Sequence, residues 1–249
     1  MSARRSFAID ALPERAAHYR GDHALVVVDV FRATTVILTA LAYGHDVHPA
    51  GSVPEALATA ARLADPLLMG EQRGVVPGGF QLDNSPAAIE ELEGRQPIVL
   101  LTSSGTVLLR NCAGARAVYV ACLRNLQATA EHLAGNEQRV ALLGAGTQGL
   151  PRPEDQLACA WIGAYLEDNG FEPETERTLQ DLRRYRGADF GQVIEGSVST
   201  DWLRSMHKGD DVDFVLGHVD DLPCVAVFDD ERVRLLSPAA SGAQPAERV

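Results

Sequence analysis

Short runs of apolar, often β-branched residues recur along the chain and predict buried strands. The clearest of these runs lie at 24–30, 97–102, 117–122, 139–144, 212–217 and 224–229. Runs that are this short and this continuously apolar are typical of parallel strands covered on both faces.

Segments with helical spacing of apolar residues separate the runs. They lie at 33–44, 53–64, 85–94, 106–114, 125–135 and 154–170, and most of them end at a glycine, as a left-handed helix C-cap requires. The alternation predicts an α/β fold with a mostly parallel sheet flanked by helices. Two more polar helical segments, 174–187 and 197–209, predict a helical lobe beside that sheet.

At 249 residues with 46% hydrophobic content, the chain can bury a full α/β core. We expect one α/β domain over 1–236, with room for two closely packed subdomains, and a flexible tail at 237–249. No stretch has the roughly 18 uninterrupted apolar residues of a membrane span, and the N-terminus lacks the apolar core of a secretory signal. We therefore expect a cytoplasmic protein with no membrane partner.

The acidic balance of the chain argues against several partners and chemistries. A formal net charge of −12 without any block of basic residues disfavours nucleic acid as a partner. A small anion would be repelled at long range, so a phosphate site must be built locally from arginines, backbone N–H groups or a metal. The single lysine, Lys208, disfavours P-loop and Schiff-base chemistry. Cys122 lacks the arginine-closed loop of cysteine phosphatases and is better interpreted as a buried thiol.

Polar residues that follow the predicted strands are the candidates for function, because ligands of open α/β sheets bind beyond the carboxyl ends of strands. Asp29 ends the first run and Arg32 follows at the turn into a helix. A carboxylate there can hold a divalent cation, and an arginine can bind phosphate in a bidentate manner. A helix-capping Asp paired with Arg32 explains the same residues equally well.

A glycine-rich connection at 69–94 carries a second group of candidates. Glu71 and Arg73 lie in this loop, and Asn84 and Ser85 precede a proline that begins the next helix, where free N–H groups can bind an anion. An ordinary capped helix explains Ser85 but does not explain Glu71 or Arg73.

The run at 97–102 leads into a turn rich in hydroxyl groups. Ser103, Ser104, Gly105 and Thr106 sit where a strand gives way to a helix, so amides and hydroxyls can form a compact cradle for an oxyanion. A plain N-cap accounts for one of these residues but not for all of them.

The loop at 144–149 has glycines spaced as in the dinucleotide-binding fingerprint. Two prolines separate its last glycine from the next helix, whereas the fingerprint requires that glycine to open the helix, so a Rossmann site is disfavoured. Gly146 and Thr147 remain candidates for anion binding. Glu154 and Asp155 begin the helix and are either N-terminal caps or metal ligands.

Five segments together resemble the 2-phosphosulfolactate phosphatase family in order and spacing. They read VVVDVFRATT, GEQRGVVPGGFQLDNSP, LLTSSGT, LLGAGTQG and EDQLACA, and the likeness extends from about Val26 to about Phe228. The resemblance implies an α/β fold, a requirement for magnesium, and hydrolysis of 2-phospho-3-sulfolactate to sulfolactate and phosphate, a step toward coenzyme M. Residues at matching motif positions are Asp29, Arg32, Glu71, Arg73, Asn84, Ser85, Ser104, Gly105, Thr106, Gly146, Thr147, Glu154 and Asp155.

The chain departs from the family pattern at two places. Gln81 stands where the family usually has Asp, and Asp83 where it usually has Gly; the turn reads TSSGT instead of TTNGT or a similar sequence. A lost carboxylate at position 81 removes a possible metal ligand unless Asp83 supplies it. The departures leave the identity of the substrate open.

Our hypothesis for the mechanism is that one Mg²⁺, held by some of Asp29, Glu71 and Asp155, binds the phosphate of a small anionic substrate. Arg32, Arg73 and the amides of the 103–106 turn stabilise the phosphoryl charge, and water activated by the metal or by Glu154 attacks. An aspartyl-phosphate on Asp29 is the competing route.

Two alternatives from other classes stay open. One is a nucleotide-dependent oxidoreductase using the 144–149 loop, and the other is a non-catalytic binder of phosphorylated or sulfonated metabolites. The sequence does not fix the oligomeric state, and a homodimer is one arrangement to test.

Overall fold

The computed structural model describes residues 4–236, so the tail predicted at 237–249 lies outside the described residues. The strands are β1 (Ser6–Ala11), β2 (Ala24–Val28), β3 (Val47–Ala50), β4 (Leu67–Gly70), β5 (Ile98–Leu101), β6 (Val118–Ala121), β7 (Arg139–Gly144), β8 (Glu172–Pro173), β9 (Ala226–Phe228) and β10 (Val233–Leu235).

Helices occupy most of the connections between these strands. The α-helices are α1 (Ala16–Tyr19), α2 (Ala33–Ala42), α3 (Val53–Ala60), α4 (Pro86–Glu90), α5 (Gly105–Asn111), α6 (Leu126–Asn136), α7 (Pro153–Asp168), α8 (Glu176–Tyr185), α9 (Phe190–Glu195), α10 (Val198–Ser205) and α11 (Gly209–Gly217). A short 3₁₀ helix precedes α1 at Pro13–Arg15, and another precedes α6 at Leu123–Asn125.

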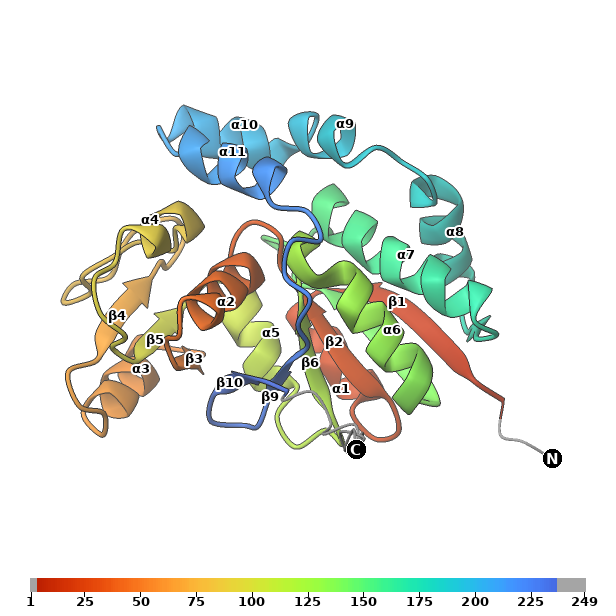
Figure 1. Cartoon of the computed structure of the whole chain (residues 1–249), viewed down its shortest axis with the longest axis horizontal. Helices are drawn as coiled ribbons and strands as arrows, with labels where there is room; N and C mark the ends of the chain where they lie inside the picture. Colours follow the sequence, from red (N-terminus) through yellow and green to blue (C-terminus); the bar gives the residue numbers. More distant parts are fainter. Residues whose placement is uncertain (1–3, 237–249) are drawn as a thin grey trace, which may run out of the picture.

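The strands form one mixed sheet in the order β4-β5-β3-β10-β9-β6-β2-β7-β1-β8. The strands β4, β5 and β3 pair in parallel, and so do β6, β2, β7, β1 and β8. Between these two parallel groups lies the antiparallel hairpin of β9 and β10. The prediction of a mostly parallel α/β sheet flanked by helices is confirmed (Figure 1).

The central strand β2 shows why these runs become strands. Each of its five residues is fully buried, and alternate side chains enter two different cores. Leu25 and Val27 pack into the core that also holds residues of α2 and α5, while Val26 and Val28 pack into the core that holds residues of α6 and α7. A continuously apolar run therefore corresponds to a strand with helices on both faces.

One predicted strand is wrong. The run 212–217 lies inside α11, which begins with acidic residues in its first turn and buries Asp211, Val212, Phe214 and Val215. A short apolar run can be either a buried strand or part of a buried helix, and periodicity alone does not distinguish the two. Five strands, β1, β3, β4, β8 and β10, were not predicted.

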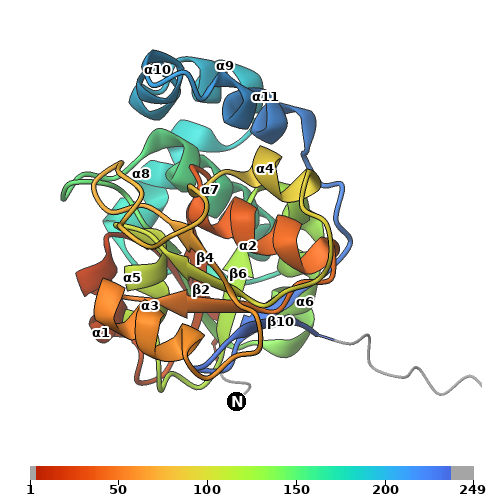
Figure 2. The ribbon, with the colours of Figure 1, turned by 90° about the vertical axis from the view of Figure 1, so that its left-hand side faces the viewer.

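The predicted helical lobe consists of α8 to α11. Figures 1 and 2 show α9, α10 and α11 grouped together at one end of the molecule, above α4 and the start of α7. Across residues 4–236, no helix combines the length and apolar character needed to cross a bilayer.

Candidate active site

A cavity of about 560 Å³ opens where several strand ends meet the helical lobe. Residues that follow β2, β4, β5 and β7 line it, although they are far apart in the sequence. The lining residues are Asp29, Phe31, Arg32, Glu71, Arg73, Gly74, Asn84, Thr102, Ser103, Ser104, Thr147, Gln148, Arg152, Val198, Ser199, Trp202 and Leu203. The volume is in the range of small-molecule sites. Asp29, Glu71 and the turn after β5 thus share one cleft, as the sequence predicted.

Two walls of this cavity differ in origin. We call Asp29, Glu71 and Thr102–Ser104 the strand-end wall, because each follows a strand of the sheet. We call Val198, Ser199, Trp202 and Leu203 the helical wall, because all four belong to α10.

Asp29 is buried in the strand-end wall immediately after β2. The pKa of its carboxyl is raised to about 7, mainly by burial and also by the nearby charges of Glu71 and Glu154, while the backbone N–H of Ala33 and the charge of Arg32 oppose the rise. A side chain on Gly105 would collide with the Asp29 carboxylate, so the absence of a Cβ at Gly105 lets Asp29 approach the turn after β5. Asp29 therefore lies close to other acidic side chains, and a bound cation would reduce their mutual repulsion.

Glu71 fixes the neighbouring loops to one another. Its Oε1 accepts a hydrogen bond from the backbone N–H of Ser103 at 2.7 Å, and its Oε2 accepts from the Ser103 hydroxyl at 2.9 Å and the Gly74 N–H at 2.6 Å. The Arg73 N–H in turn donates to the Ser103 hydroxyl. Glu71 therefore holds Arg73 next to the hydroxyl-rich turn.

Within that turn the hydroxyl groups divide into two kinds. Thr102 and Thr106 close the turn reciprocally, since the N–H of each residue donates to the hydroxyl of the other. Ser104 is the N-cap residue of α5, but its side chain makes no capping bond, and it lines the cavity. Thr106 and Gly105 shape the turn, whereas Ser103 and Ser104 face the cleft.

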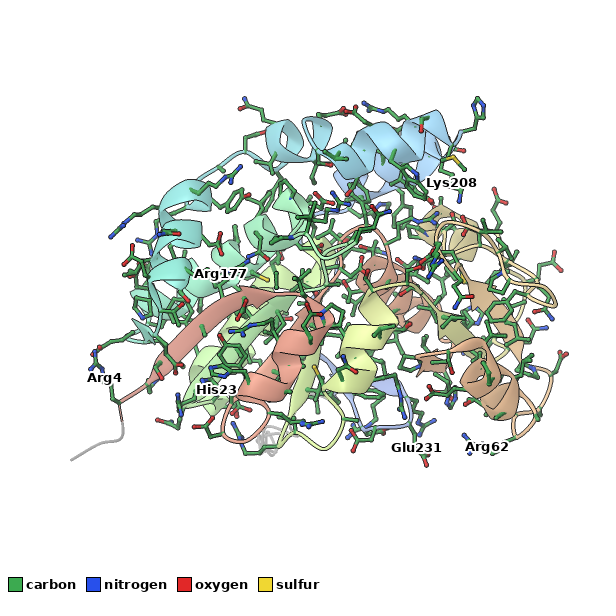
Figure 3. The ribbon with its side chains drawn as sticks, turned by 180° about the vertical axis from the view of Figure 1, so that it is seen from behind. Arg4, His23, Arg62, Arg177, Lys208 and Glu231 are labelled. Carbon is green, nitrogen blue, oxygen red and sulfur yellow. The ribbon has the colours of Figure 1, made fainter. Side chains whose placement is uncertain are left out.

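Arg32 lines the cavity, but its guanidinium is already paired. Its Nη1 donates to Asp211 at 2.6 Å and to Asp83 at 3.1 Å, and Lys208 pairs with the same Asp83 at 2.6 Å. Figure 3 shows Lys208 at the point where the helical lobe meets the α4 segment. Ser85 caps α4 and donates to Asp211, so it joins this network and does not line the cavity.

The two departures from the family pattern have structural roles here. Gln81 accepts a hydrogen bond from the Leu68 N–H at 2.8 Å and so ties its own segment to β4. Asp83 pairs with Arg32 and Lys208, and although burial opposes the change, these cations lower its pKa. Neither residue lines the cavity, so Asp83 does not replace a carboxylate at position 81.

The loop after β7 is held by Asp155. Its Oδ1 accepts from the Val30 N–H at 2.9 Å and its Oδ2 from the Gly146 N–H at 3.1 Å, so both carboxylate oxygens bind backbone. Gly146 therefore lends its amide to Asp155 and does not line the cavity, whereas Thr147 does. The helix α7 begins at Pro153, beyond the last glycine of the loop, and does not give the geometry of a dinucleotide fingerprint.

Three buried polar atoms around the cavity have no hydrogen-bond partner among the described residues. They are Asn84 Oδ1, Arg152 Nε and Glu154 Oε2. Burial raises the pKa of Glu154, and the hydroxyls of Ser199 and Ser197 and the charge of Arg152 oppose this. Buried polar groups are nearly always satisfied, so unpaired atoms gathered at a cleft indicate a place for a polar ligand.

The metal-binding potential of the site rests on few carboxylates. Within residues 4–236, no three His, Cys, Asp or Glu side chains are arranged to hold an ion together. Mg²⁺ commonly needs only one or two carboxylates, with water and substrate oxygens completing its octahedron. Asp29 fits such a role best, because it lines the cavity and burial disfavours its charged form, which a cation would stabilise.

Sequence reasoning missed the helical wall and Arg152. The spacing of Val198 and Trp202, four residues apart on a polar helix, was the available signal, and their side chains are 63% and 42% exposed. Cys122, by contrast, is fully buried, and burial raises the pKa of its thiol to about 12, which is unsuited to a nucleophile at neutral pH.

Comparisons with known proteins identify the family of the chain. The chain matches the sequence model of the family described as 2-phosphosulpholactate phosphatase over residues 10–231. It is 46% identical to a probable 2-phosphosulfolactate phosphatase of Symbiobacterium thermophilum over 171 residues, which are 65% of this chain and 73% of that protein.

Two further relatives align over more of the chain. The identity is 34% over 212 residues with a probable 2-phosphosulfolactate phosphatase of Deinococcus radiodurans, covering 83% of this chain and 86% of that protein. It is 32% over 223 residues with one of Pseudothermotoga lettingae, covering 89% and 95%. Fold, site and similarity together show that the chain belongs to the 2-phosphosulfolactate phosphatase family.

Proposed function

We propose that this chain is a magnesium-dependent phosphatase that hydrolyses a small anionic phosphate ester, 2-phospho-3-sulfolactate, to 3-sulfolactate and phosphate. The observation that carries the proposal is the shared cavity, in which Asp29, the Ser103–Ser104 turn and Arg73 come from separate strand ends and face one another. Membership of the family supports the choice of substrate.

The strand-end wall supplies the groups that bind the phosphoryl oxygens. Ser103 and Ser104 offer hydroxyls and amides, and Arg73, held beside them by its own backbone bond to Ser103, offers a guanidinium. Such donors stabilise the transition state when they are fixed before the substrate arrives. The bonds from Glu71 to Ser103 and Gly74 provide that fixation.

Asp29, with the charge of Glu71 or Glu154 nearby, would hold the magnesium ion. When bound, that ion would neutralise charge on the transferred phosphoryl group and lower the pKa of a bound water. Glu154 has an Oε2 without a hydrogen-bond partner among the described residues, and burial raises its pKa, so it would be the general base that takes up a proton from the attacking water. Asp155 keeps the loop after β7 against β2 and acts through position alone.

Phosphate release from 2-phospho-3-sulfolactate tests this function directly. We expect release with Mg²⁺, none with EDTA, and recovery when Mg²⁺ is restored. Asp29→Asn should lower kcat by about 10³-fold or more, the size expected when a key charged group of the site is removed. Wild-type turnover by Asp29→Asn at saturating Mg²⁺ would exclude both metal binding and nucleophilic attack by Asp29.

A further inference from the structure

The cavity holds two arginines that no carboxylate neutralises. In this acidic chain most arginines of the described part pair with an acid, and Arg32 pairs with two. Arg73 and Arg152 line the cavity and form no ion pair with any described residue. Unpaired guanidinium groups in a cleft are suited to bind anionic groups of a ligand, because each offers a planar set of donors.

The two arginines belong to different parts of the cleft. Arg73 lies in the loop after β4, and its N–H donates to Ser103 at 2.7 Å, which places it beside the hydroxyl-rich turn. Arg152 lies at the end of the loop after β7, where it is the residue before α7, and its neighbours in the lining include Thr147 and Gln148. Because the two arginines come from separate loops, a ligand with two anionic groups can pair one group with each of them.

The side chain of Arg152 is not used by the fold. Although it occupies the N-cap position of α7, it makes no capping bond, and its buried Nε has no hydrogen-bond partner within residues 4–236. It acts electrostatically on Glu154, without forming an ion pair with it. A structural arginine would be expected to satisfy its donors within the protein.

We propose that Arg152 is a specificity-determining residue that binds the second anionic group of the substrate, a carboxylate or a sulfonate, while Arg73 and the Ser103–Ser104 turn bind the phosphate. This inference rests on the proposed function and deepens it by assigning one residue to an acidic group on the organic part of the substrate.

Binding of the two halves of the substrate separates the two subsites without requiring turnover. Full-length protein is titrated calorimetrically with sulfolactate and with inorganic phosphate. Arg152→Gln should weaken sulfolactate binding by about 10-fold or more and change phosphate binding by less than about 2-fold, and Arg73→Gln should do the reverse. Arg152→Lys, which keeps the charge but loses the planar fork, should lie between wild type and Arg152→Gln.

Arg95→Gln is the matched control, because Arg95 is exposed and does not line the cavity. It should leave both affinities unchanged. Titration with lactate and with 2-hydroxyethanesulfonate then shows which acidic group Arg152 binds, since only that ligand should be weakened by Arg152→Gln.

Two outcomes would overturn the proposal: wild-type protein that binds no sulfolactate, or an Arg152→Gln variant that weakens phosphate as much as sulfolactate. A protein that binds both anions with the expected pattern but releases no phosphate from the ester would overturn the proposed function and uphold the second anion site.

Discussion

The strand-end wall and the helical wall of the cavity are held in place by different interactions. Asp29, Glu71 and Asp155 accept hydrogen bonds from backbone N–H groups of neighbouring loops, and these loops continue from buried strands. The lobe that carries α10 is joined to the α4 segment through side chains, by Lys208 with Asp83 and by Asp211 with Arg32 and Ser85. Hydrogen bonds from backbone N–H groups beside buried strands fix the carboxylates that accept them closely, whereas ion pairs between side chains of separate segments, such as Lys208 and Asp83, hold those segments more loosely.

This difference indicates that the two walls have different functions. The groups proposed to act on the phosphoryl group lie in the strand-end wall, where small displacements are prevented. The partly exposed Trp202 and Val198 lie in the helical wall, where the organic part of a ligand would pack. Reactive groups on rigid elements and selectivity on a more mobile segment are a common arrangement.

The strongest test of the strand-end wall is the pH dependence of stability without metal. The pKa of Asp29 is raised from 3.8 to about 7, so between these values the folded chain retains a proton that the unfolded chain has lost. The free energy of unfolding should therefore fall as the pH rises from about 4 to about 7. The difference between the two pKa values corresponds to at most about 4 kcal/mol.

Urea unfolding in EDTA across this pH range measures the effect. Asp29→Asn should make the fall shallower, while Asp65→Asn, at an exposed acid outside the cavity, should not. If the free energy of unfolding fell equally steeply with pH in Asp29→Asn, the raised pKa of Asp29 would not be the cause of the fall.

A steric change in the strand-end wall should have the next largest effect, which is a fall in kcat. The Cβ introduced by Gly105→Ala would collide with the Asp29 carboxylate and with Ala33. Displacing a reacting group by about 1 Å can lower the rate by about 10²-fold. We expect kcat to fall by about this factor while the far-ultraviolet circular dichroism spectrum is unchanged. Near-wild-type kcat would mean that the strand-end wall can shift to accommodate the added methyl group, which contradicts the rigid wall inferred from its hydrogen bonds.

Loosening the attachment of the helical lobe should have a smaller effect. Asp83→Asn removes the charge that pairs with Lys208 and Arg32, but Arg32 keeps Asp211. Because a partly exposed ion pair contributes modestly, we expect KM to rise by about 3- to 10-fold with little change in kcat. Hydrogen exchange of α10 and α11 should become faster, and unchanged exchange would contradict the attachment.

Truncation of the helical wall itself should have the smallest effect. Trp202 rests against Gly74 and is partly exposed, so Trp202→Ala removes packing area without touching the strand-end wall. We expect KM to rise by about 3-fold and kcat to stay within about 2-fold, in keeping with the loss of partial apolar burial. A large fall in kcat would show that α10 contributes to catalysis, so the two walls would not differ in function.

The strand-end wall could be predicted from the sequence because its residues directly follow recognisable strands. The run at 24–30 locates Asp29, and the run at 97–102 locates the hydroxyl-rich turn, with no knowledge of distant contacts. The positions of Glu71 and Asn84 came from the family resemblance and the loop pattern, since the four-residue strand β4 is too short to be recognised alone.

The remaining features depend on tertiary structure. Whether Arg32 is free for a ligand depends on Asp211, which lies 179 positions later in α11, next to the run 212–217 that was predicted as a strand. Likewise, Arg152 and α10 meet the cleft only through the packing of α7 and the lobe. Local patterns carry no information about such contacts, so neither the pairing of Arg32 nor the position of α10 beside the cleft could be predicted, although the spacing of Val198 and Trp202 was visible.

The hairpin of β9 and β10 has a consequence for biosynthesis. It joins the parallel group that supplies Glu71 and Ser103 to the group that supplies Asp29 and Thr147, and it is the last part of the sheet to leave the ribosome. A nascent chain that ends before residue 226 lacks the strands linking the two halves of its catalytic cleft. Activity should therefore arise only after residues 226–235 have been synthesised, which leaves products truncated before them without a completed site.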